Sequence, residues 1–201
     1  MKAHNSRFKM FKSILVDFSR SKHVEWPNMT LQGTVISPKA SHKFLGVMLN
    51  QDLLWHQQAD YAIGKASKWI MAYRRLARVA TGVNLWLMRQ LYMAVTIPKM
   101  MYTIEVWLTP LQQQDGAKKC TGSVGMVNRL ASLQRVAALA ITGAMHTTAT
   151  DVIDLHADLL PMRLATHRLC QQATLRIASL PETHLLHDVS HRQARRYIKS
   201  H

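Results

Sequence analysis

The strongest constraint on this fold is a helical repeat of apolar residues that begins after Leu53. Over residues 55–80, apolar or small side chains recur at intervals of three and four, as on one face of an amphipathic α-helix. They are Trp55, Ala59, Ala62, Ile63, Ala66, Trp69, Ile70, Tyr73, Leu76, Ala77 and Ala80. Thr81-Gly82 follows as a plausible helix end. The sequence therefore predicts a long helix with one buried face.

Further helices are predicted in the middle of the chain. Residues 84–97 carry a second repeat, and Pro98 should end or kink it because proline has no backbone N–H. Residues 99–107 fit another short helix. Residues 127–143 form a strong helical repeat that stops at Gly143, since glycine favours the C-terminal end of a helix.

The C-terminal third predicts two helices. A Thr-x-x-Asp pattern starting at Thr148 suggests a capped start for a short helix that reaches Ala157. Residues 160–180 predict a long helix with Pro161 in its first turn and Pro181 just past its end.

The N-terminal part has the composition of short strands. Residues 13–18, 33–36 and 44–49 are rich in β-branched and apolar residues, and the polar run 50–52 has the composition of a turn. We expect a small antiparallel element that is too small to fold alone.

The predicted fold class is mainly α (α+β), with a small antiparallel β element at the N-terminus followed by a helical bundle. The expected divisions are strands over 1–52, helices over 53–110, a loop over 111–126, helices over 127–183 and a flexible tail over 184–201.

Charge is the outlier in composition. Twenty-six Lys and Arg face 11 Asp and Glu, for a net charge of +15 and an isoelectric point near 10.4. Such a field attracts polyanions, nucleic acid first and anionic lipid second. Basicity without a specific partner is the alternative.

The remaining composition indicates an intracellular protein, nuclear or cytoplasmic. Cys120 and Cys170 are isolated, which fits a reducing compartment. The most apolar window, 85–110, contains three charged residues and has Pro98 near its centre. Because each charge at bilayer depth costs about 2.5–3.5 kcal/mol, no membrane span is expected.

The first long helix carries a candidate nucleic-acid-binding face. Lys65, Lys68 and Arg75 recur at helical spacing, and Arg74 and Arg78 form a second column beside them. Side chains of this kind bind phosphates without reading sequence. An ordinary solvated helix face is the alternative interpretation.

Other candidate groups have simpler explanations. The aromatic residues are expected to pack in the core rather than to stack on bases: Trp55, Trp69, Trp86, Trp107, Tyr73, Tyr92 and Tyr102. Asp151, Asp154 and Asp158 should form a solvated stripe near a helix N-terminus. The spacing of His184, His187 and His191 is only a loose match to a metal site. We expect no metal ligands.

Several segments follow one another in a recognisable order. KSILVDFSRSK (12–22) and KFLGVMLN (43–50) precede an Arg-Arg-Leu at 74–76. LMRQLYMAVTIP (87–98) follows, and then LASLQRVAALAITGAMHTTATDVIDLHADLLPMRL (130–164). Together they resemble the end of the reverse transcriptase of a non-LTR (LINE-type) retrotransposon, over about residues 8–187. The order and spacing of the segments carry this resemblance, because each motif is weak alone.

The resemblance implies a fold and a partner. Residues 12–22 would be a palm strand and residues 43–50 a hairpin at the end of the palm, and the helices would form the thumb and a connection. A thumb lies along the template–primer duplex, so it implies nucleic-acid binding by Lys65, Lys68, Arg74, Arg75, Arg78 and Arg89. Phe44, Leu45 and Gly46 would support the primer end. The partner would be an RNA–DNA or DNA duplex, with no small-molecule substrate.

The sequence also departs from the family pattern. The Asp-Asp pair that holds Mg²⁺ in the intact polymerase is absent, so no catalytic residue and no cofactor is expected here. Thr103 stands in place of a glycine, and Ala149 in place of the proline of a Thr-Thr-Pro run. Leu185 replaces the proline of His-Pro-Leu. These losses suggest a truncated, decaying copy.

Two functions therefore stay open. The first is a non-catalytic fragment of an RNA-directed DNA polymerase whose parent grips the template–primer duplex. The alternative is a self-standing basic helical module that binds nucleic acid or protein.

Overall fold

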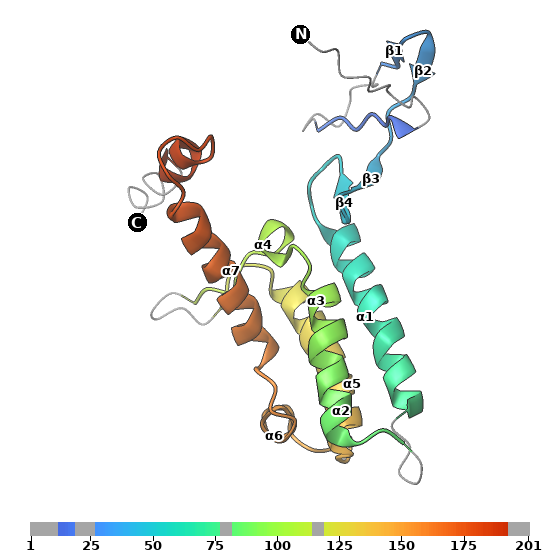
Figure 1. The fold of residues 1–201 in the computed structure, drawn as a ribbon, viewed down its shortest axis with the longest axis vertical. Coiled ribbons are helices and arrows are strands. Elements are labelled where there is room, and N and C mark those ends of the chain that lie inside the picture. Colours follow the sequence, from blue (N-terminus) through green and yellow to red (C-terminus); the bar gives the residue numbers. More distant parts are fainter. Residues whose placement is uncertain (1–11, 19–26, 77–81, 114–118, 193–201) are drawn as a thin grey trace, which may run out of the picture. The chain divides into compact units, whose positions relative to one another are not determined.

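The chain is mainly helical. The computed structural model describes residues 12–18, 27–76, 82–113 and 119–192. In that part lie seven α-helices, one π-helical segment and two antiparallel two-stranded sheets (Figure 1). The chain forms two compact units, Met1–Tyr61 and Ala62–His201. The predicted mainly helical class with a small N-terminal β element is confirmed.

The first sheet is a tight hairpin. β1 (Met29–Leu31) pairs with β2 (Thr34–Ile36). The turn between them has φ of 47° at Gln32 and 78° at Gly33. Positive φ at both central residues is the type I′ geometry, whose twist matches that of the flanking strands.

The second sheet is also a tight antiparallel hairpin. β3 (Ser41–Phe44) pairs with β4 (Val47–Asn50), and the turn has φ of 46° at Leu45 and 89° at Gly46. Residues 44–49 are therefore the end of one strand, a turn and a second strand. The prediction of a single strand there is wrong, because the Leu-Gly pair reverses the chain.

The other strand predictions have mixed outcomes. Residues 34–36 form β2 as expected. Residues 13–18 form no named strand, and Leu15 makes only an isolated bridge with Pro38.

Helix α1 (His56–Leu76) follows the predicted apolar repeat, whose last residues, 77–80, lie outside the described part. In the first unit, Gln58 at its start accepts a hydrogen bond from the Met48 backbone N–H at 2.8 Å. This contact fixes the second hairpin to the first turn of the helix. In the second unit, α1 buries Ile70 and Tyr73, and the Tyr73 hydroxyl donates to the Leu91 carbonyl at 3.2 Å.

The next helix continues through a proline. α2 (Leu85–Leu91) leads into the π-helical segment η2 (Tyr92–Thr96) and then α3 (Ile97–Met100). The Ile97 N–H donates to the Tyr92 carbonyl, five residues back. This wider turn makes room for Pro98, whose ring would clash with a carbonyl in a regular helix. Pro98 therefore does not end the helix.

After α3 the chain makes a short turn into α4 (Ile104–Trp107). Thr103 precedes α4 and has φ of 51°, in the left-handed region. The predicted helix over 99–107 is therefore two short helices with a break at this residue.

Three helices complete the second unit. α5 (Val124–Thr142) ends at Gly143, which has φ of 66° and donates to the Leu139 carbonyl as predicted. α6 (Thr150–His156) has Ala149 at its N-cap, so the predicted Thr148 cap is wrong. α7 (Met162–Ala178) begins after Pro161, close to the prediction.

The core of the second unit lies around α5. α5 contacts α2, α6 and α7, and these helices surround it (Figure 1). The main apolar cluster comprises Ile70, Tyr73, Met88, Tyr92, Ala137, Ala138, Ile141, Ile153, Ala157 and Leu159. Burial of these side chains is the main stabilising contribution.

A polar network crosses this core. The Tyr92 hydroxyl donates to Gln134 Oε1 at 3.5 Å, and Gln134 Nε2 donates to Asp154 Oδ1 at 3.2 Å and to the Leu160 carbonyl at 3.1 Å. Loss of water around the Asp154 carboxyl raises its pKa above the ordinary 3.8.

The raised pKa predicts a pH dependence. The folded state binds the Asp154 proton more tightly than the unfolded state, so ionisation at neutral pH destabilises the fold and this effect fades as pH falls toward 4. We expect Asp154→Asn, which carries no charge, to be less destabilising at pH 7 than at pH 4.5. Chemical denaturation of both proteins at the two pH values measures the difference. A difference between wild type and variant that does not change with pH would contradict this.

Candidate nucleic-acid interface

Three of the predicted basic residues share one exposed face of α1. Lys65, Lys68 and Arg75 are all exposed, on the side of the helix away from the buried Ala66 and Ile70. At 100° per residue they fall within an arc of about 80°. We call these three residues the basic face of α1.

Small residues lie between these cations. Gly64 and Ala72 are exposed and fall in or beside the same arc. A Cβ added to Gly64 would meet no atom within 4 Å, so the helix surface at Gly64 is open with respect to the residues that the structure describes. A phosphate backbone can therefore approach the helix closely while the three long side chains reach it.

The other predicted basic residues do not join this face. Arg74 is about 100° from Arg75 around the helix. It lines a cavity of about 480 Å³ with Val136, Gly143 and His146 beside the end of α5. Arg78 lies outside the residues that the structure describes.

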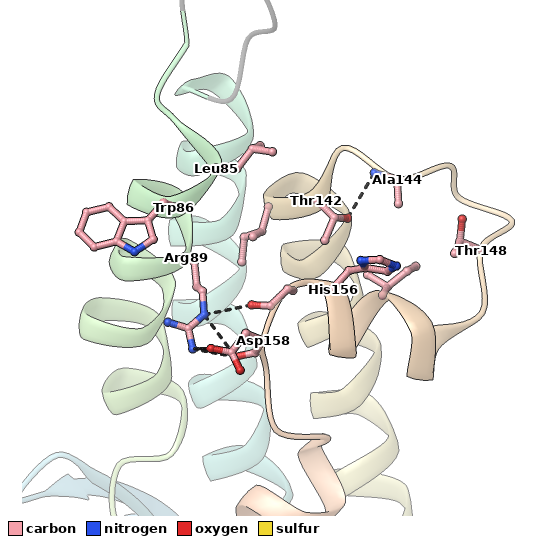
Figure 2. Close-up of a pocket in the computed structure, with 11 residues that line it drawn as sticks. Leu85, Trp86, Arg89, Thr142, Ala144, Thr148, His156 and Asp158 are labelled. Atoms are coloured by element: carbon pink, nitrogen blue, oxygen red, sulfur yellow. Dashed lines mark hydrogen bonds and ion pairs between the residues drawn. The ribbon is translucent and has the colours of Figure 1, made fainter.

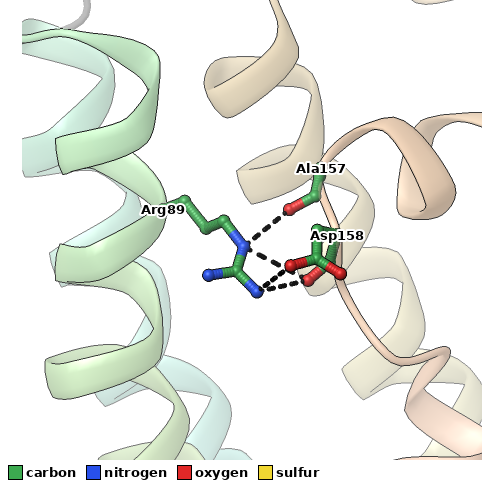
Figure 3. A network of polar contacts seen from close by, with 3 residues as sticks. All are labelled: Arg89, Ala157 and Asp158. Atoms are coloured by element: carbon green, nitrogen blue, oxygen red, sulfur yellow. Dashed lines mark hydrogen bonds and ion pairs between the residues drawn. The ribbon is translucent and has the colours of Figure 1, made fainter.

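Arg89 has a structural position instead. Its Nε donates to the carbonyls of Ala157 at 3.0 Å and Asp158 at 3.2 Å (Figure 3). Its Nη2 donates to the Asp158 carbonyl at 2.8 Å and pairs with Asp158 Oδ2 at 2.6 Å. These carbonyls close the C-terminal end of α6, where a cation is favoured by the helix dipole. Arg89 therefore fastens α2 to the connection between α6 and α7.

A pocket of about 560 Å³ opens beside Arg89 (Figure 2). Apolar residues of α2, α5 and α6 line it together with Ala144 and Ala157, and its polar members besides Arg89 are Thr142, Thr148, His156 and Asp158. The Trp86 ring points outward from α2, away from His156 (Figure 2). Sequence reasoning missed this pocket, because its residues come from three separate segments with no common motif.

The three primer-grip-like residues come together at one hairpin tip. Phe44 is 60% exposed and Leu45 is 76% exposed, and Gly46 completes the turn. A leucine at φ of 46° is a strained residue, which is often found at functional sites. Behind the tip, Lys43 Nζ donates to the Tyr61 hydroxyl. The tip belongs to the first unit, and the basic face of α1 belongs to the second.

The aromatic residues only partly follow the prediction. Trp107, Tyr92 and Tyr73 are buried as expected. Trp86 and Tyr102 are 61% and 49% exposed, so the expectation of core packing is wrong for them. Trp86 lies in α2, and Tyr102 lies in the turn between α3 and α4. The helical repeat does not determine which of its apolar positions a neighbouring element buries.

Trp69 is also more exposed than predicted, at 39%. Lys99 Nζ lies 3.9 Å from the centre of its ring, which is a cation–π contact. Trp69 therefore joins α1 to α3 at the edge of the core.

The acidic residues are arranged differently from the predicted stripe. Asp154 is buried in the core network, while Asp151 and Asp158 are exposed. Within the described residues, no group of three or more His, Cys, Asp or Glu could hold a metal ion. In the same part of the chain, every helix is too short or too polar to cross a membrane.

No known protein family, curated protein or solved structure matches this chain.

The role of Arg89 is testable by substitution. Arg89→Lys keeps the charge but loses the fork that contacts two carbonyls, so we expect the free energy of unfolding to fall by about 1–2 kcal/mol. Asp158→Asn should have a smaller effect, because an exposed ion pair contributes little. Urea denaturation of both variants distinguishes the two. A larger loss in Asp158→Asn would show that the ion pair matters more than the capped carbonyls.

Proposed function

We propose that the chain is a non-catalytic part of an RNA-directed DNA polymerase of the non-LTR retrotransposon type, which in its parent grips the template–primer duplex. The observation that carries this proposal is the backbone at the three positions where the sequence departs from the family pattern. At each one, the geometry favours the residue that the family has.

Thr103 occupies a glycine-like position. Its φ of 51° lies in the left-handed region, where a residue with a Cβ is disfavoured by about 1–2 kcal/mol. The family has glycine here, which adopts this conformation without that penalty.

Ala149 and Leu185 occupy proline-like positions. Ala149 has φ of −60° just before α6, close to the angle that the proline ring imposes. Leu185 is the second residue of a turn closed by the His187 N–H and the His184 carbonyl at 2.9 Å. Proline is favoured at this turn position, and the family has proline at both sites.

These positions support an ancestral fold built around other residues. Glycine at 103 and proline at 149 and 185 would each suit the backbone found at these positions. The three substitutions therefore fit a copy whose sequence has drifted while its backbone has kept its earlier shape.

The basic face of α1 supplies the proposed grip. Three exposed cations over less than three turns, with small residues between them, can contact phosphates without contacting base edges. The chain's net charge of +15 adds long-range attraction to any nucleic acid. Arg89 is not part of the grip in this proposal, because its guanidinium donates to the carbonyls of Ala157 and Asp158, which follow α6.

A self-standing basic module is the second candidate. The compactness of residues 62–201 around their own core favours it, since this unit could act without a parent polymerase. Preference for an RNA–DNA hybrid over duplex DNA supports the polymerase origin, and equal binding supports the module.

The grip predicts a salt dependence that the basic face controls. We expect the triple variant Lys65→Gln, Lys68→Gln, Arg75→Gln to lose a slope of about 2.7 in log K against log salt, for three phosphate contacts on duplex DNA. Fluorescence anisotropy with labelled hybrid and duplex, over a salt series, measures both slope and preference.

A matched control separates position from charge. Arg129→Gln, Arg176→Gln, Arg192→Gln removes the same charge from exposed sites on other segments. It should leave most of the slope unchanged. If both triple variants lose the same affinity, net charge and not the α1 face binds the nucleic acid.

If the backbone keeps the geometry of the family, substitutions that restore the family's residues should stabilise the fold. We expect Thr103→Gly to raise the free energy of unfolding by about 0.5–1 kcal/mol, since relief of strain exceeds the added chain entropy of glycine. Ala149→Pro should add about 0.4–1 kcal/mol by restricting the unfolded chain. Thr174→Gly, within α7, is the control and should destabilise. Thermal melts that show losses for both reversions would remove the main support for this origin.

A further inference from the structure

We propose that the corner formed by α6 and α7 binds a second copy of this chain, with Asp151 of each copy paired to Arg168 of the other. The surface is separate from the basic face of α1. It combines an apolar groove, an exposed apolar ridge and two opposite charges that have no ion-pair partner among the residues the structure describes.

The groove lies between two helices. A cavity of about 320 Å³ separates η2 and α3 from α7. Met93, Ile97 and Met101 lie one turn apart along one wall, and Ala165 and Leu169 lie along the other. Methionine side chains adapt to the shape of apolar partners. Among the described residues that line this groove, Arg168 is the only charged one.

The floor of the groove favours an apolar occupant. Gln134 and Tyr92 lie there, but both are already hydrogen-bonded within the core network. Gln134 Nε2 uses its donors on Asp154 and the Leu160 carbonyl. An incoming polar group would find few partners at the floor, so an aliphatic side chain fits best.

The ridge is the outer face of α6. Leu155 is 80% exposed and Val152 is 41% exposed, and both lie opposite the buried Ile153 and Asp154. Asp151 is exposed beside them, one turn before Leu155. The ridge is therefore apolar with one carboxylate, which complements a groove with one guanidinium.

The two charges are available to a partner. Asp151 and Arg168 make no ion pair and no side-chain hydrogen bond with any other residue in the described ranges. An unpaired Arg amid Met and Leu, with few other charges, has the composition of a protein–protein interface core.

Groove and ridge are continuous. α6 ends at His156, and Leu159 and Leu160 already line the groove. Leu160 and Leu164 extend the exposed apolar surface toward Arg168, at 45% and 54% exposure. A two-fold axis between ridge and groove would place each Leu155 against the other copy's groove and would form the Asp151–Arg168 pair twice. Such a contact is self-complementary and closed, which makes a dimer and not a filament.

The net charge sets the conditions for association. Two copies of charge +15 repel at long range, and this repulsion is screened over about 8 Å at physiological salt. Dimerisation should therefore strengthen from low to physiological salt, while nucleic-acid binding weakens. The salt dependences of dimerisation and of nucleic-acid binding have opposite signs. A chain that does not dimerise can therefore still bind nucleic acid, and a chain that does not bind nucleic acid can still dimerise.

Sedimentation equilibrium of the full chain tests the proposal. We expect a monomer–dimer equilibrium with a Kd on the order of 10 µM. Arg168→Asp and Asp151→Arg should each weaken it at least tenfold, and Leu155→Lys should do the same. In an equimolar mixture of the two single variants, a heterodimer forms both opposite-charge pairs, so the mixture should dimerise although each variant alone does not. The double variant restores both pairs in a homodimer and should dimerise like the wild type.

Controls keep the result interpretable. Arg176→Asp, on the same helix outside the groove lining, should not change the equilibrium. Circular dichroism melts establish that each variant folds. A wild-type chain that stays monomeric up to about 100 µM at physiological salt overturns the proposal. So does a dimer that the double charge swap fails to restore.

Discussion

The guanidinium of Arg89 holds together the part of the fold on which most other features depend. It reaches from α2 to the carbonyls of Ala157 and Asp158, which directly follow α6 and lie 68 and 69 residues further along the chain. Ala157 and Leu159, on either side of this contact, are buried in the core cluster. The contact therefore sets where α6 ends and where the chain turns into α7. The pocket of Figure 2 and the α6–α7 corner both follow from that turn.

A second long-range link reinforces the first. Gln134 on α5 bonds Tyr92 of η2, Asp154 of α6 and the Leu160 carbonyl before α7. One amide thus joins the three segments that surround α5. Such a network is strong only when every member is satisfied, and here its burial raises the pKa of Asp154. The core of the second unit is specified by these polar contacts as well as by apolar packing.

The positive charges divide into two kinds. Lys65, Lys68 and Arg75 are exposed on one face of α1, whereas Arg89 and Arg135 donate to backbone carbonyls near α6. Both kinds of basic residue occur on helical repeats in a strongly basic chain, so composition does not distinguish an exposed cation from one that donates to the backbone. Only the exposed residues of α1 can contribute to phosphate binding without the loss of hydrogen bonds that stabilise the fold.

The sequence by itself determined the helices, most of their ends and the shared face of Lys65, Lys68 and Arg75. These features depend on residues three to eleven positions apart, and the helix period relates such residues directly. Gly143 and Pro161 mark helix boundaries for equally local reasons. Tertiary structure decided the roles of Arg89 and Asp154 and the exposure of Trp86. These roles depend on contacts between segments 20 to 69 residues apart in the sequence. The helix period does not relate such residues, because the turns between the helices take their direction from packing.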